Sequence, residues 1–95
     1  MKKFNLNKKN IAIIGLGYVG LPLAIAFSKK FKVLGFDTDI NRIRELSNFI
    51  DSSKEVSRKD LSNSKLELTH ESEDLSDANI FIITVPTPVD KKNKP

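Results

Sequence analysis

Short apolar runs alternate along the chain with amphipathic or polar segments, a pattern that predicts strands separated by helices. Ile11–Ile14 and Asn79–Val85 are almost continuously apolar, which is typical of strands buried on both faces of a parallel sheet. Phe31–Asp37 predicts a further strand, and the alternating segment Lys65–Thr69 predicts a shorter one. A sheet of about four strands is therefore expected.

Helices are predicted in the segments between these strands. Over residues 18–30, small and apolar residues recur at helical spacing and predict one buried face. That face would carry Gly20, Leu23, Ala24 and Phe27. A second helix is predicted to follow Thr38 or Asp39, because either side chain can cap a helix N-terminus. Shorter helical turns are predicted near Ser57–Leu61 and over Glu71–Ala78.

The alternation of strands and helices implies an α/β fold with a mostly parallel sheet and right-handed crossovers. A doubly wound sheet with strand order 3-2-1-4 is the simplest arrangement. Pro86–Pro88 ends the last strand, because proline cannot donate a hydrogen bond to a neighbouring strand. Since only a short polar segment follows, we expect the N-terminal portion of a longer protein. Its parts would be a basic tail over 1–10, the sheet domain over 11–88 and a second tail over 89–95.

Composition narrows the class of protein. The 95 residues suffice for one small domain, and 39% hydrophobic with 29% charged residues are typical of a globular protein. The net charge of +4 comes largely from lysines near both ends, which indicates solvated tails and no nucleic-acid surface. The absence of cysteine excludes disulfides, zinc–thiolate sites and thiol catalysis within this chain, and no metal site is predicted. With no export signal and no membrane-spanning stretch, we expect a cytoplasmic protein without membrane contact.

The segment GLGYVG matches the pattern G-x-G-x-x-G, directly after a predicted strand and at the start of a predicted helix. In that setting Gly15 would allow a tight turn, Gly17 would let a pyrophosphate approach the backbone, and Gly20 would let the helix pack closely. Backbone N–H groups and the helix dipole would bind the phosphates. The candidate cofactor-binding residues are Gly15, Leu16, Gly17, Tyr18, Val19 and Gly20.

An acidic residue should follow the second strand, about 20 residues beyond the glycines, if the ligand is a dinucleotide. Asp37 stands there, where it could accept hydrogen bonds from ribose hydroxyls and repel a 2′-phosphate, which favours NAD over NADP. Alternatively, Asp37 is only a turn or capping residue. Arg42 could reach the adenosine or a phosphate, or pair with Glu45, and Thr87 is either a ligand contact at the sheet edge or a turn residue. His70 is expected to face solvent or to pack, because no partner for catalysis stands in a recognisable pattern.

Three segments together resemble the UDP-glucose/GDP-mannose dehydrogenase family, the nucleotide-sugar 6-dehydrogenases. They are IAIIGLGYVGLPLAIAF, VLGFDTDINRIREL and IITVPTPVD, and the resemblance extends over nearly the whole chain from Ile11 onward. The chain is most similar to bacterial members that act on UDP-N-acetylhexosamines, such as UDP-N-acetylgalactosamine and UDP-N-acetylglucosamine, for capsule and surface polysaccharides.

The resemblance implies a Rossmann-type NAD-binding domain, a UDP-sugar substrate bound outside this chain, and a homodimer for the full-length protein. Residues 15–20 would bind the pyrophosphate and Asp37 the ribose, with Arg42 near the adenosine and Pro86 and Thr87 near the cofactor. Members of the family oxidise C6 of the sugar twice, to a uronic acid, and reduce two NAD. They use a catalytic cysteine, which this chain lacks, so no catalytic residue is expected within it.

Two alternatives remain open. One is another Rossmann oxidoreductase, of the β-hydroxyacid dehydrogenase type, although Asp37 disfavours the NADP that such enzymes often use. The other is a non-catalytic nucleotide-sensing module with the same fold.

Overall fold

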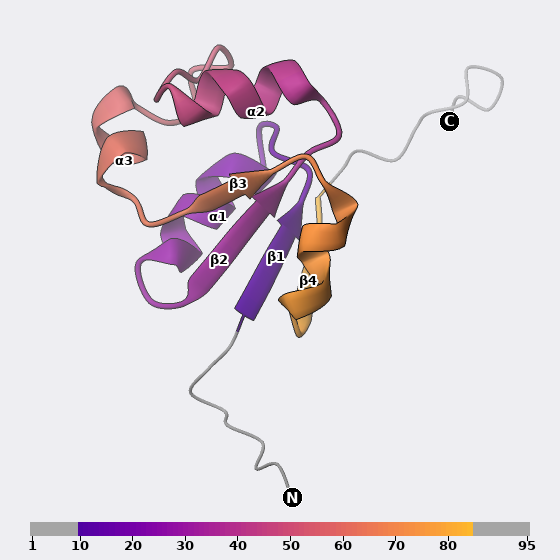
Figure 1. Cartoon of the computed structure of the whole chain (residues 1–95). Helices are drawn as coiled ribbons and strands as arrows, with labels where there is room; N and C mark the ends of the chain where they lie inside the picture. The colour runs from indigo at the N-terminus through magenta and orange to yellow at the C-terminus, as the bar shows by residue number, and fades with distance from the viewer. Residues whose placement is uncertain (1–9, 85–95) are drawn as a thin grey trace, which may run out of the picture.

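The computed structural model describes residues 10–84, which form a four-stranded parallel sheet with helical segments on both sides (Figure 1). The strands are β1 (Asn10–Ile14), β2 (Lys32–Phe36), β3 (Glu67–Thr69) and β4 (Ile80–Ile83). They lie in the order β3-β2-β1-β4, and every pairing is parallel. The predicted α/β fold and its strand order are confirmed.

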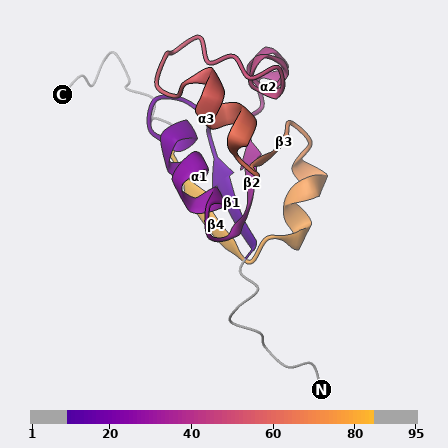
Figure 2. The same cartoon turned by 90° about the vertical axis from the view of Figure 1, so that its left-hand side faces the viewer.

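Each crossover between strands contains helix. α1 (Gly20–Ser28) connects β1 to β2, α2 (Ile40–Ser47) and α3 (Arg58–Asn63) connect β2 to β3, and the 3-10 helix η1 (Ser72–Asp77) connects β3 to β4. Figure 2 shows α1 and η1 on opposite sides of the sheet. Within residues 10–84, no helix is both long and apolar enough to cross a lipid bilayer.

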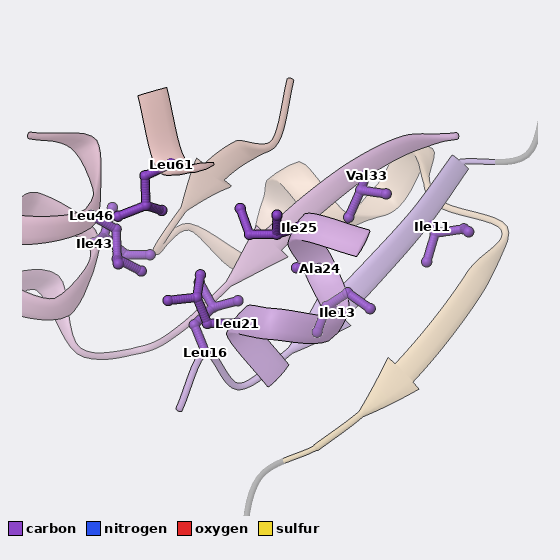
Figure 3. Close-up of a cluster of buried hydrophobic side chains, with 10 residues drawn as sticks. All are labelled: Ile11, Ile13, Leu16, Leu21, Ala24, Ile25, Val33, Ile43, Leu46 and Leu61. Carbon is purple, nitrogen blue, oxygen red and sulfur yellow. The ribbon is translucent and has the colours of Figure 1, made fainter. Parts of the chain in front are cut away.

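One apolar core lies between the sheet and helices α1 to α3 (Figure 3). The sheet contributes Ile11, Ile13 and Val33, and the turn that follows β1 contributes Leu16. The helices contribute the remaining buried residues, which are Leu21, Ala24, Ile25, Ile43, Leu46 and Leu61. Full burial of a leucine or isoleucine side chain contributes about 1.5–3 kcal/mol to folding. This core therefore fixes α1 and α2 against the same side of the sheet.

The buried face of α1 differs from the predicted one. Its buried residues are Gly20, Leu21, Ala24, Ile25 and Ser28, whereas Leu23 and Phe27 are half-buried at the margin of the core. The prediction is confirmed for Gly20 and Ala24 and wrong for Leu23 and Phe27, because α1 is apolar almost all round and helical spacing alone cannot identify the buried side. The rotation of α1 is limited instead by the close approach of Gly20 to the carbonyl of Gly15.

The ends of the helices follow the predicted capping. Of the two candidates before α2, Asp39 is the cap, and its carboxylate accepts a hydrogen bond from the N–H of Asn41 (2.9 Å). The Ser57 hydroxyl accepts one from the N–H of Asp60 (3.1 Å) at the start of α3. Pro22 is the third residue of α1, and it donates no hydrogen bond between the N–H groups of Leu21 and Leu23, which donate to the carbonyls of Gly17 and Val19.

β4 forms one edge of the sheet. Phe81 and Ile83 on this strand are 51% and 68% exposed. As expected from the sequence, little within residues 10–84 covers one flank of β4.

One buried carboxylate organises the loop between α2 and α3. The Asp51 side chain has no exposed area. Its oxygens accept hydrogen bonds from Arg42 Nη1 (2.9 Å), from the hydroxyl and N–H of Ser53 (2.6 and 3.0 Å), and from the N–H groups of Glu55 (2.8 Å) and Val56 (2.9 Å). Burial alone would raise the pKa of Asp51, but the hydrogen bonds from Ser53, Val56 and Arg42 outweigh it and hold that pKa well below its usual range.

The contact at Gly20 predicts a loss of stability in Gly20→Ala. The added Cβ would overlap the Gly15 carbonyl and the Thr84 hydroxyl, so the backbone has to shift. Overpacking of this kind costs about 1–3 kcal/mol, more than the helix propensity of alanine returns. Gly17→Ala is the matched control, because its Cβ would meet nothing within 4 Å, and its free energy of unfolding in urea should change by less than about 0.5 kcal/mol. Equal unfolding free energies for the two variants would contradict the close contact.

The buried Asp51 predicts a pH-dependent stability. Because its pKa is lowered by folding, its contribution is present above the ordinary aspartate pKa and is lost as pH falls through the folded value. The difference in unfolding free energy between wild type and Asp51→Asn should therefore shrink as pH falls from about 5 towards 2. Urea unfolding at a series of pH values measures this difference. A difference independent of pH would show that Asp51 is not held ionised by the fold.

Candidate functional site

The glycine turn, residues 15–20, joins β1 to α1 at the carboxyl edge of the sheet. Gly15 has a φ of 100°, a backbone conformation that favours glycine. Its N–H donates a hydrogen bond to the carbonyl of Phe36 at the end of β2 (2.8 Å). At the other end of the turn, Gly20 leaves no room for a Cβ beside the Gly15 carbonyl. Backbone conformation and close packing therefore account for glycine at these two positions.

Gly17 has neither constraint. Its φ lies outside the left-handed region, and a Cβ at this position would meet nothing within 4 Å. The neighbouring Tyr18 and Val19 are 70% and 65% exposed. Among the hydrogen bonds of residues 10–84, none is donated by the N–H groups of these three residues, and no side chain caps α1. The turn thus presents free N–H groups and the positive end of a helix dipole to open space, an arrangement suited to an anion.

Asp37 lies against this turn from the end of β2. One carboxylate oxygen accepts a hydrogen bond from the N–H of Leu16 (3.0 Å), and the other accepts one from the N–H of Asp39 (3.0 Å). Asp37 is therefore a turn residue, as the structural alternative held. An ionised carboxylate can accept about four hydrogen bonds, so capacity for ribose hydroxyls remains.

Arg42 reaches the same turn from α2. Its Nε donates to the carbonyl of Leu16 (2.7 Å), and its Nη1 donates to Glu45 (2.6 Å) and to Asp51 (2.9 Å). The expected pair with Glu45 is confirmed, and hydrogen bonds from Ser52, with that from Arg42, lower the pKa of Glu45. The Arg42 side chain is only 12% exposed, and its buried Nη2 has no hydrogen-bond partner among the described residues.

Thr84, just after β4, is a structural residue of the site that the sequence analysis did not identify. Its hydroxyl lies 2.8 Å from the Gly15 carbonyl and 3.1 Å from that of Ile14, and its N–H donates to Ile14 (2.8 Å). These bonds tie the end of β4 to the glycine turn. The sequence signal for Thr84 is a polar residue within a predicted apolar strand, and this signal does not identify its hydrogen-bond partners.

The structure brings Asp37 and Arg42 to the glycine turn, and their predicted contacts with a cofactor stay a prediction. Pro86 and Thr87 lie outside the described residues. His70 follows β3, with Nδ1 3.5 Å from the Glu71 carboxylate and a side chain 36% exposed, in agreement with the expectation that it faces solvent or packs. Residues 10–84 contain no group of three or more acidic, histidine or cysteine side chains able to hold a metal ion.

Several known proteins are similar to this chain in sequence and in fold. Residues 9–95 match the family model described as UDP-glucose/GDP-mannose dehydrogenase family, NAD binding domain. Protein CapL of Staphylococcus aureus is 53% identical over 87 residues, which cover 92% of this chain and 20% of CapL. UDP-N-acetyl-D-glucosamine 6-dehydrogenase of Pseudomonas aeruginosa is 50% identical over 86 residues, with 90% and 20% covered. The structure of a UDP-D-ManNAc dehydrogenase from Pyrococcus horikoshii superimposes with a TM-score of 0.76 at 38% identity, covering 86% of this chain and 21% of that one.

The chain spans about a fifth of the length of these relatives. The family match extends over the glycine turn, Asp37 and Arg42, and it favours the nucleotide-sugar dehydrogenase interpretation over the alternatives. The chain belongs to the UDP-glucose/GDP-mannose dehydrogenase family and corresponds to its NAD-binding domain.

Proposed function

We propose that the glycine turn, Asp37 and Arg42 bind NAD for an enzyme that oxidises C6 of a UDP-N-acetylhexosamine to a uronic acid. The observation that carries this proposal is the open space at Gly17, beside three N–H groups that donate no hydrogen bond within residues 10–84, at the uncapped start of α1. The fold itself has no need of glycine there. A pyrophosphate that contacts the backbone does need it, because any side chain would stand in its way.

Each part of the site has one role in this proposal. The N–H groups of residues 17–19 bind the pyrophosphate, and the free acceptor capacity of Asp37 binds the adenosine ribose. Arg42 lies beside the adenosine, and Pro86 and Thr87 remain predicted contacts beyond β4. When bound, NAD supplies the hydride acceptor, while the residues of this chain bind and orient it.

The substrate is inferred from the names of similar proteins. These include a UDP-N-acetyl-D-glucosamine 6-dehydrogenase and a UDP-D-ManNAc dehydrogenase, both named for UDP-N-acetylhexosamines. We infer two NAD reduced per sugar, a homodimer in the cytoplasm, and a role in capsule or surface-polysaccharide synthesis. The substrate site and the catalytic residues would lie outside this chain, which contains no cysteine.

Gly17→Val tests the pyrophosphate site. The valine side chain would occupy the space beside the exposed N–H groups, so NAD affinity in the intact protein should fall by at least about a hundredfold, as expected when several charge-assisted hydrogen bonds are lost. Thermal unfolding should change little, because nothing lies within 4 Å of that position. Ala26→Val, on the exposed side of α1, is a bulk-matched control and should leave binding unchanged. Undiminished NAD affinity in a folded Gly17→Val protein would overturn the proposed function.

Asp37→Asn tests the recognition of the ribose. Asparagine retains an acceptor oxygen for the backbone but removes the charge, so NAD should bind about tenfold more weakly and NADP should be rejected less strongly. Calorimetric titration with each nucleotide measures both effects. Asp39→Asn is the matched control, since asparagine caps a helix as well as aspartate does. The same change in selectivity in both variants would assign it to the general charge of the region and not to Asp37.

A further inference from the structure

The backbone of Leu16 is bound by two charged side chains of opposite sign. Asp37 accepts the hydrogen bond from its N–H (3.0 Å), and Arg42 Nε donates one to its carbonyl (2.7 Å). The Arg42 guanidinium is therefore bonded to the same residue as the carboxylate proposed to hold the ribose, at the next peptide group along the chain. This inference rests on the proposed function, in which the ribose hydroxyls lie at Asp37.

An arginine in this position has a second possible role. In dinucleotide-binding folds, an arginine near the end of the second strand can accommodate the 2′-phosphate of NADP. Here the guanidinium is already engaged, because Nη1 donates to both Glu45 and Asp51 while Nε donates to Leu16. Within residues 10–84, the one guanidinium nitrogen of Arg42 without a hydrogen bond is Nη2, and it is buried.

Of the two carboxylates, Asp51 is the more firmly held. Its side chain is completely buried, and four further hydrogen bonds from Ser53, Glu55 and Val56 fix its position. The Glu45 side chain is 24% exposed and is bound by Ser52 in addition to Arg42. Asp51 therefore provides a fixed point to which the guanidinium is bonded.

We propose that Asp51 is a positioning residue for cofactor specificity: with Glu45, it holds Arg42 on the Leu16 carbonyl and prevents its guanidinium from binding the 2′-phosphate of NADP. Two carboxylates, those of Glu45 and Asp51, are then bonded to one guanidinium, and a third, that of Asp37, is bonded to the N–H of the same Leu16 whose carbonyl Arg42 holds. The region keeps an excess of negative charge, which disfavours an additional phosphate. Arg42 thus stabilises the glycine turn without binding the 2′-phosphate of NADP.

Asp51→Asn in the intact protein tests the proposal, with NAD and NADP affinities measured by calorimetric titration. Release of Arg42 should weaken the binding of NAD, because the Leu16 carbonyl loses its hydrogen-bond donor. It should strengthen the binding of NADP, because the guanidinium becomes available to the 2′-phosphate. We expect the preference for NAD over NADP to fall about tenfold. Asp60→Asn removes a similar charge from α3 without a contact to Arg42 and should leave the preference unchanged.

A double variant separates positioning from general damage to the loop. In an Arg42→Met background, Asp51→Asn should no longer change the preference, since the group it acts through is absent. If Asp51→Asn lowers the affinities for NAD and NADP alike, or changes the preference for NAD over NADP equally with and without Arg42, the proposal is wrong.

A measurement without nucleotide distinguishes this proposal from the proposed function. The NMR signal of the Arg42 Nε–H should be protected from exchange in the wild type and lose that protection in Asp51→Asn. An unchanged signal overturns the positioning role even if NAD binds. A lost signal in a protein that binds no NAD supports the positioning role and refutes the proposed function instead.

Discussion

The candidate site depends on how the backbone and side chain of Leu16 are held. Its N–H and carbonyl are bonded to Asp37 and Arg42, and its side chain is fully buried. Gly35 on β2 leaves room for this side chain, because a Cβ there would lie 3.0 Å from the Leu16 side chain and force it to shift. With the first half of the turn fixed in this way, the second half can remain exposed and keep its N–H groups free. A flexible turn would have to be ordered at the expense of binding energy.

The structural and functional interpretations of Asp37 are compatible. The two backbone hydrogen bonds that make it a turn residue also fix its carboxylate beside the glycine turn, so that its remaining lone pairs face a ligand in a defined place. The same applies to Arg42, whose ion pair with Glu45 is one part of its attachment to the turn. Binding sites of this kind use side chains that are already held by the fold, which lowers the entropy lost when a ligand binds.

The sequence predicted the order of the strands, the capping residues and the glycine turn, because each depends on local chemistry or on the alternation of apolar runs. It did not predict the buried face of α1, since an apolar helix has no unique hydrophobic side and Gly20 decides its rotation by contact. Asp51 was not recognised either. It stands in a polar, serine-rich segment typical of solvated loops, and its burial results from a contact with Arg42 nine positions earlier, formed only when the loop folds back over α2.

The strain in that loop supports a role for Asp51 beyond stability. Phe49, directly after the C-cap residue of α2, has a φ of 63°, and Lys54 has a φ of 61°. A left-handed backbone costs a residue with a side chain about 1–2 kcal/mol, and glycine would avoid the cost at both positions. The hydrogen bonds of Asp51 to Ser53, Glu55 and Val56 hold the loop in this conformation, with its carboxylate directed at Arg42. A buried ion pair contributes little net stability, because the desolvation of both charges offsets their attraction. The advantage of this strained loop is therefore the fixed position of one guanidinium at the glycine turn.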